Sequence, residues 1–470
     1  MDDLQHPENS RTPAARRTAT ERDRRTQVQK RIDELRRRKK KERRRSVHPL
    51  LRVLPAALLI SFILLCVLSA AITFMGRTEG SNHLSAALPP SNSAQLETVA
   101  AGSGTISQPS IFSVAAYLLD PQTGDVLYSK NAEQSYAMAS TTKIMTGILA
   151  IENSSLENPV LISGHAVAVG ESSAWLSAGE TLTTEQLLYA LLLQSANDAA
   201  VALAESVSGS EAAFVAMMNE KVSELGLEHT HFSNPHGLDQ QGHYTSAHDL
   251  AEIAAYAMKN SLFRQITGTD SYQIPWPGHP FPRVMQNHNK LLKMYAYAIG
   301  GKTGYTSNAG KCLVAAARQE GRELISVVLN GGDSYWDQTV QLMEYGFNSF
   351  ARVEFAYSGE PLGKISVGNF PSREVKAVSG NDLVFTVRKD FLRDFEKASI
   401  YYSEHLPYPV QEGQEVGYMV VGEGTPAEKQ VPLTSDSRQN SPNIFVRFFA
   451  FTGSVFALWW KGLQWIIPGI

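Results

Sequence analysis

The sequence predicts the α+β fold class from three observations. Residues 111–351 carry strand patterns near both of their ends. Between those patterns lie long stretches in which Ala and Leu recur at helical spacing. Residues 352–435 then change to short extended runs interrupted by Gly, Pro and Asn-Asp. We therefore expect strands from both ends of one domain to enclose inserted helices, with a small separate β domain after it.

The first domain is expected to open with a hairpin. Ser113–Leu119 and Val126–Ser129 are extended patterns, and the turn-forming residues 120–124 separate them. The later elements are, in chain order, helices over Thr184–Ser206 and Glu211–Leu225, a helix capped at Ser246 that runs to about Lys259, and a hairpin of Cys312–Ala317 with Leu324–Leu329. The β domain is expected from the runs Lys364–Val367, Glu374–Val378, Leu383–Val387 and Gly417–Val421.

The 470 residues divide into two regions of opposite charge. Residues 1–52 carry 18 Lys+Arg against 8 Asp+Glu, a net +10, and the remaining 418 residues carry 25 against 38, a net −13. The 24 residues Val53–Gly76 contain no charge, and a bilayer core needs roughly 20 apolar residues. We therefore expect residues 53–76 to form a transmembrane helix. The basic head before it predicts a cytoplasmic N-terminus, with everything after Arg77 on the other side of the membrane.

Two alternatives remain for this N-terminal part. A cleaved signal peptide is disfavoured because the apolar run exceeds the usual 7–15 residues and about fifty residues precede it. A nucleic-acid-binding tail is disfavoured because the basic block Lys30–Arg45 has no interleaved aromatic residues and adjoins the apolar run. We expect contact with the membrane and none with nucleic acid.

Flexible and amphipathic segments border the folded domains. Residues 77–110 are rich in Ser, Ala, Gly and Pro, which is typical of a linker. Residues 443–470 hold eight aromatic residues, and their uncharged run Phe448–Trp460 is 13 residues long. Because this run is too short to span a bilayer comfortably, we expect a membrane-associated helix, with a core helix of the β domain as the alternative.

The overall composition excludes two further classes. With 43% hydrophobic and 19% charged residues, the chain is not disordered throughout. Cys66 and Cys312 are too few for a disulfide scaffold, and their spacing fits neither a thiol-redox motif nor a four-ligand zinc site.

Three short motifs carry the chemistry. Ser140-Thr141-Thr142-Lys143 places a hydroxyl and an amine on one helical face, where an unprotonated lysine can take the serine proton during attack on a carbonyl. The apolar stretch after it, Ile144–Ile151, predicts burial that lowers the lysine pKa. Ser195-Ala196-Asn197 follows 55 residues later (195 − 140), and Lys302-Thr303-Gly304 follows after another 107 (302 − 195). Each triplet alone is typical of an ordinary turn, but their order indicates catalysis.

With these motifs the chain resembles the serine D-alanyl-D-alanine carboxypeptidases, the low-molecular-mass penicillin-binding proteins, over about residues 111–435. The likeness extends to the motif Asn-Pro-His-Gly-Leu-Asp at 234–239, to residues 245–249, to 287–292 and to 303–310. It implies an antiparallel sheet flanked by helices, a helical subdomain, and an active site in the cleft between them. The N-terminal anchor departs from the cleaved signal that is common in that family.

The resemblance also implies a role for each motif residue. Ser140 would be the acylated nucleophile, Lys143 its base, and Ser195 the group that passes a proton to the departing amine. Asn197, Lys302, Thr303, Gly304 and Tyr305 would bind the substrate, with the backbone N–H groups of Ser140 and Tyr305 as the oxyanion hole. The implied partners are peptidoglycan pentapeptides that end in D-Ala-D-Ala and, as covalent inhibitors, β-lactams; no metal or cofactor is implied.

Two rival functions come from other classes. A zinc-dependent peptidase would use the histidines at 229, 231, 236, 243 and 248, yet none of their spacings matches the HExxH pattern. A non-catalytic sensor would be acylated by β-lactams at Ser140 without turnover. A class A β-lactamase shares the motifs, but it depends on a glutamate after the SxN motif, and residues 229–249 contain none.

Overall fold

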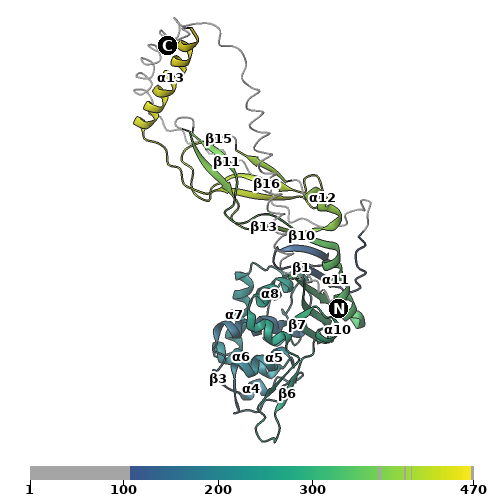
Figure 1. Ribbon diagram of the computed structural model, residues 1–470. Helices are drawn as coiled ribbons and strands as arrows, with labels where there is room; N and C mark the ends of the chain where they lie inside the picture. Colours follow the sequence, from purple (N-terminus) through teal and green to yellow (C-terminus); the bar gives the residue numbers. More distant parts are fainter. Residues whose placement is uncertain (1–105, 369–371, 396–397, 404, 467–470) are drawn as a thin grey trace, which may run out of the picture. The chain divides into compact units, whose positions relative to one another are not determined.

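The computed structural model describes residues 106–466, except 369–371, 396–397 and 404, and these residues form two compact units (Figure 1). The first unit comprises residues 106–353 and 385–392, and the second comprises 354–384 and 393–466. The predicted basic head, the predicted transmembrane helix and nearly all of the predicted linker lie outside the described residues. The predicted domain boundaries therefore stay predictions.

A five-stranded antiparallel sheet forms the centre of the first unit, as expected for the α+β class. Its strands, in spatial order, are β2 (Asp125–Lys130), β1 (Ala115–Asp120), β9 (Arg322–Leu329), β8 (Gly310–Gln319) and β7 (Ala298–Thr306). Both predicted hairpins are present, and β1 pairs with β9 to join the two ends of the domain. The strand β7 lies at the edge of this sheet.

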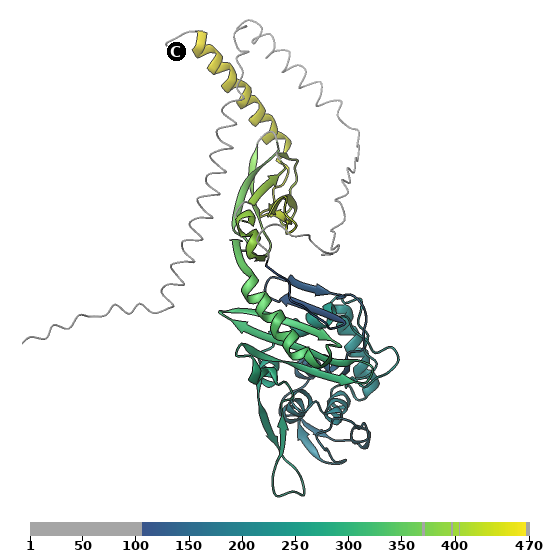
Figure 2. The same cartoon turned by 90° about the vertical axis from the view of Figure 1, so that its right-hand side faces the viewer.

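Helices cover both faces of the sheet. Successive side chains of its strands point to opposite faces, and apolar side chains on each face pack against helices. In β9, Leu324 and Val328 pack with Leu342 and Met343 of α11 (Tyr335–Ser349). The alternate residues of β9 enter the larger core, which holds the helices of the middle of the chain. Figure 2 shows α11 lying across one face of the strands.

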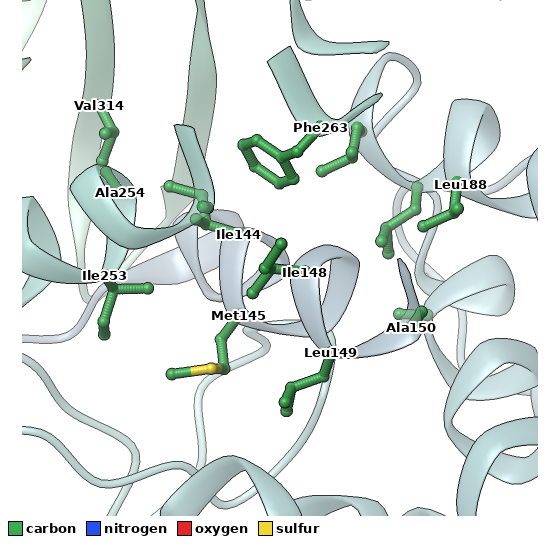
Figure 3. Close-up of a cluster of buried hydrophobic side chains, with 14 of the residues drawn as sticks. Ile144, Met145, Ile148, Leu149, Ala150, Leu188, Ile253, Ala254, Phe263 and Val314 are labelled. Carbon is green, nitrogen blue, oxygen red and sulfur yellow. The ribbon is translucent and has the colours of Figure 1, made fainter. Parts of the chain in front are cut away.

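The middle of the chain forms the predicted helical subdomain. Its helices are η1 (Ala139–Thr142), α3 (Lys143–Asn153), α4 (Gly164–Val167), α5 (Thr184–Leu192), α6 (Asn197–Ser208), α7 (Glu211–Glu224), α8 (Ala247–Lys259) and α9 (Ser261–Gly268). The core between them is mostly apolar around α3, where Ile144 and Ile148 lie near Phe263 (Figure 3). This packing buries the whole first half of α3.

One predicted helix is wrong in extent. Thr184–Ser206 is not continuous, because α5 ends at Leu192 and α6 begins at Asn197. Between them Ser195 has φ +63°, a left-handed conformation that no α-helix tolerates. Helical periodicity continues across the break, so it did not reveal the turn. The other expected helices, 211–225 and the one capped at Ser246, match α7 and α8, and the Ser246 hydroxyl accepts the Asp249 N–H at 3.1 Å.

Short elements complete the first unit. They are the two-stranded ribbons β3 (Pro159–Leu161) with β4 (Thr181–Thr183) and β5 (Ser271–Ile274) with β6 (Arg283–Gln286), together with α10 (Leu291–Met294) and η2 (Gly332–Ser334).

The second unit is the predicted small β domain. Its six-stranded sheet has the order β14 (Ala398–Tyr402), β16 (Glu415–Val421), β17 (Lys429–Ser435), β12 (Arg373–Val378), β11 (Pro361–Val367) and β15 (His405–Leu406). Residues 350–395 also contain β10 (Phe350–Ala356), β13 (Leu383–Arg388), η3 (Lys389–Phe391) and α12 (Leu392–Phe395), of which η3 and parts of the other three belong to the first unit. The four predicted extended runs coincide with β11, β12, β13 and β16.

The chain ends in the long helix α13 (Ile444–Ile466). Its described side chains include large apolar residues that are more than half exposed, namely Ile444, Phe445, Phe448, Phe449 and Phe456. In the described part of the chain, no single helix is both long and apolar enough to cross a membrane, and α6 with α7 meets that test together only across a bend of 84°.

Candidate active site

Ser140 and Lys143 lie where two helical segments meet at the edge of the core. Ser140 belongs to η1, and Lys143 is the first residue of α3, so their side chains share one face as predicted. The Lys143 Nζ donates to Ser140 Oγ at 2.9 Å and to Asn197 Oδ1 at 2.7 Å. The pair is thus held in the geometry that proton transfer between oxygen and nitrogen requires.

The charge state of Lys143 follows from its surroundings. Its side chain is fully buried, and burial lowers its pKa well below the ordinary value, with a smaller contribution from the positive charge of Lys302. Lys302 is 1% exposed, and burial lowers its pKa to about 7. When Lys143 is neutral, its two N–H groups serve Asn197 Oδ1 and the His236 carbonyl, and its lone pair can accept the proton of Ser140. The negative charge of Asp198 opposes the neutral state more weakly than burial and Lys302 favour it.

Ser195 and Asn197 reach the site because of the break between α5 and α6. The left-handed turn at Ser195 directs its hydroxyl toward Lys302, whose Nζ donates to Ser195 Oγ at 2.9 Å. Asn197, the first residue of α6, accepts from Lys143 and donates through Nδ2 to the Gly170 carbonyl at 2.9 Å. The structure therefore joins all three motifs through two lysines.

The third motif lies on the edge strand β7. A Cβ added at Gly304 would lie 3.0 Å from Ser140 N and 3.1 Å from Met138 O, so β7 passes directly beside η1. Thr303 is half-buried and Tyr305 is 66% exposed. Only a residue without a side chain allows the nucleophile and the open edge of the sheet to lie this close.

The loop 234–239 supplies a group that the motifs did not identify. The backbone carbonyl of His236 accepts from Lys143 Nζ at 2.5 Å and completes the contacts of that amine. Asn234 shapes the loop, since its Oδ1 accepts from Gly237 N at 2.7 Å. Gly237 has φ +91°, and a Cβ there would lie 2.0 Å from Ala139 O. The sequence signal for this loop is the Asn-Pro-His-Gly-Leu-Asp segment itself.

A frame of polar contacts that the sequence did not predict holds the loop 170–180 against α6. Asp198 accepts from the N–H groups of Ala174 and Leu176, at 3.0 and 3.1 Å. The buried ion pair of Arg283 with Glu180, at 2.6 Å, holds the far end of the same loop. Because Gly170 in this loop binds Asn197, the frame positions the second motif.

The histidines of the zinc-peptidase alternative do not gather around one point. His236 and His243 are neutral, because burial lowers their pKa to about 3 and about 4. His243 Nε2 lies 2.8 Å from Thr142 Oγ1, while His231 Nδ1 lies 2.7 Å from the Gly242 carbonyl. These rings support the loop beside Lys143 and do not form the open three-ligand site of a zinc peptidase.

A serine activated by a buried neutral lysine, between a helical subdomain and the open edge of an antiparallel sheet, defines a serine hydrolase of the acyl-enzyme type. Residues 103–333 match the family model described as D-alanyl-D-alanine carboxypeptidase, and residues 350–439 match that of the penicillin-binding protein 5 C-terminal domain. The chain belongs to the D-alanyl-D-alanine carboxypeptidase family and is a serine-type enzyme of that family.

Individual relatives agree with this assignment. D-alanyl-D-alanine carboxypeptidase DacF of Bacillus subtilis is 33% identical over 315 residues, which cover 65% of this chain and 80% of the relative. DacA of Escherichia coli is 30% identical over 368 residues, which cover 75% and 89%. The structure of penicillin binding protein 5 from Haemophilus influenzae matches with a TM-score of 0.65 at 27% identity, covering 72% of this chain and 100% of that chain. These findings give no support to the zinc peptidase or the non-catalytic sensor.

Proposed function

We propose that the enzyme removes the terminal D-alanine from peptidoglycan pentapeptide stems through an acyl-enzyme at Ser140, and that penicillins acylate the same serine. The observation that carries this proposal is the Lys143 amine, fully buried and 2.9 Å from Ser140 Oγ. A neutral lysine is a base at neutral pH, and its Nζ lies within hydrogen-bond distance of the nucleophile.

In the first step Ser140 Oγ bonds to the carbonyl carbon of the penultimate D-alanine while its proton moves to Lys143 Nζ. The backbone N–H groups of Ser140 and Tyr305 stabilise the resulting oxyanion. Ser195 Oγ already accepts from Lys302, so its own hydrogen is free to pass to the departing amine as the C–N bond breaks, and the proton that Lys143 took from Ser140 then restores the Ser195 hydroxyl. A water molecule next bonds to the acyl carbon while Lys143 takes its proton, and that proton returns to Ser140 Oγ as the ester bond breaks and the shortened stem leaves.

Lys302 and Thr303 select a substrate with a free C-terminal carboxylate. Lys302 is buried beside the open edge of β7, where its pKa of about 7 leaves a substantial fraction charged at neutral pH. An arriving carboxylate stabilises the ammonium form, and the Thr303 hydroxyl adds a hydrogen bond. An internal peptide bond offers no such charge, which accounts for carboxypeptidase specificity.

The test uses the full chain purified in detergent, with a fluorescent penicillin and a D-Ala-D-Ala pentapeptide as substrates. Ser140→Ala is expected to abolish both penicillin labelling and D-alanine release. Ser135→Ala is the matched control, because this exposed serine lies five residues earlier (140 − 135) and contacts only the His229 carbonyl at 3.4 Å. Labelling that survives Ser140→Ala would contradict the proposal.

For localisation, we propose a bacterial cell membrane with the basic head in the cytoplasm and the catalytic unit outside. The charge-free stretch 53–76 behind the basic block and the exposed aromatic residues of α13 support this proposal. Protease added to intact cells is expected to digest the catalytic unit and spare residues 1–52. A mature protein that begins after residue 76 would show cleavage instead.

A further inference from the structure

A group of metal-ligand side chains lies outside the hydrolytic machinery. Among the described residues, Glu133, His248 and Asp249 each place a ligand atom within 4.8 Å of the other two. Glu133 follows β2, whereas His248 and Asp249 lie in the first turn of α8. His229 borders this group, since its Nδ1 lies 3.5 Å from Glu133 Oε2. One imidazole and two carboxylates thus converge from two segments of the chain.

Two atoms of this group are buried without a hydrogen-bond partner. His248 Nδ1 and Asp249 Oδ1 lie 3.3 Å apart, within ion-pair distance, but without the alignment of a hydrogen bond. The Asp249 side chain is 1% exposed. Its other oxygen, Oδ2, accepts from His229 N and from Thr230 Oγ1, both at 2.8 Å, which fixes Oδ1 toward His248. The buried oxygen Oδ1 therefore faces the His248 ring without an aligned hydrogen-bond donor, and a metal ion between the two atoms would satisfy both.

The separations between these atoms fit a metal ion. A tetrahedral zinc ion, with bonds of about 2.0–2.1 Å, holds its ligand atoms about 3.3–3.4 Å apart. The separations within the group are 3.2 Å from His248 Nδ1 to Glu133 Oε2 and 3.3 Å from His248 Nδ1 to Asp249 Oδ1. The two carboxylates would balance the charge of a divalent ion.

We propose that Glu133, His248 and Asp249 bind a divalent transition-metal ion and leave one position open, with zinc as the test ion. Imidazole and carboxylate ligands suit such an ion. The hydrogen bonds from His229 N and Thr230 Oγ1 to Asp249 are the outer contacts that orient a ligating carboxylate. The site differs from that of a zinc peptidase, because the nucleophile remains Ser140.

An ion at this site would link two segments that lead to the catalytic lysine. Glu133 lies seven residues before Ser140 (140 − 133), and His229 lies seven before His236 (236 − 229), whose carbonyl binds Lys143. The same segments already meet through the backbone, where His248 N donates to Ala132 O at 3.0 Å. We therefore expect the ion to stabilise the frame of the active site without entering the reaction.

The experiment measures zinc binding to the full chain, stripped with a chelator and dialysed against zinc chloride near neutral pH. We expect one zinc per chain and a higher midpoint of thermal unfolding. Glu133→Gln and His248→Gln are expected to lower zinc affinity by at least the roughly 10–100-fold that loss of an outer contact costs. His231→Gln is the control, since this histidine lies near the group in sequence, but its ring contacts the Gly242 carbonyl and stacks on Tyr244.

The outcomes separate this inference from the proposed function. Glu133 is 59% exposed, so Glu133→Gln tests the site without disturbing the core. Wild-type protein that binds no zinc, or equal binding by wild type, Glu133→Gln and His248→Gln, would overturn the inference and leave the function untouched. Folded metal-free protein is expected to retain D-alanine release, whereas a zinc-dependent release that survives Ser140→Ala would contradict the proposed function instead.

Discussion

Replacing Gly237 by alanine is expected to slow acylation of Ser140 on the order of 100-fold, because the added methyl group collides with the backbone before the nucleophile. The new Cβ would lie 2.0 Å from Ala139 O, whereas ordinary contacts begin at 3.4 Å. The loop and η1 must therefore separate by about 1.4 Å (3.4 − 2.0). Displacing a reacting group by ~1 Å costs about 100-fold in rate.

Gly242→Ala is the matched control for this substitution. Gly242 lies in the same loop with φ +80°, but a Cβ there meets its nearest atom, Ser233 Oγ, at 3.4 Å. Both variants lose about 1–2 kcal/mol of folding free energy from a left-handed alanine. Only Gly237→Ala should also lose rate, measured as the rate constant for labelling by a fluorescent penicillin. The steric argument would be refuted if Gly237→Ala were labelled at the wild-type rate, or if Gly242→Ala lost as much labelling rate as Gly237→Ala.

Three further predictions concern pH, stability and penicillin turnover. The value of kcat/KM for the pentapeptide should rise with pH as Lys143 loses its proton, then fall above about pH 7 as Lys302 loses its charge. Lys302→Arg should remove the falling limb, because arginine keeps its charge. A profile that this substitution leaves unchanged would contradict the assignment. Arg283→Ala should lower the free energy of unfolding in urea by about 3–5 kcal/mol, because it leaves Glu180 buried without its partner. Lys293→Ala, which removes an exposed ion pair, should lower it by at most about 1 kcal/mol. Equal losses would show that burial of the Arg283–Glu180 pair is unimportant. The penicillin acyl-enzyme should persist, as measured by mass spectrometry over time. A β-lactamase would be indicated instead if the chain hydrolysed penicillin at tens per second, within the ordinary range of about 1–10³ per second, and left the pentapeptide intact.

Local patterns predicted most of the fold because hydrophobic periodicity depends only on neighbouring residues. The strands β1, β2, β8 and β9 and the helices α7 and α8 occur where alternation or helical spacing placed them. The same patterns failed at Ser195, where apolar spacing continues through a left-handed turn. Nothing local distinguishes such a turn, since contacts made by Ser195 across the fold stabilise it.

The sequence by itself determined which groups carry the chemistry: the hydroxyl and amine of Ser140 and Lys143, and the order of the two later motifs. Tertiary structure alone decided whether those groups can react. The low pKa of Lys143 depends on burial and on Lys302, 159 residues away (302 − 143). The His236 carbonyl that binds it carries no side-chain signature at all. Desolvation and backbone contacts belong to the packed chain, so no motif could specify them.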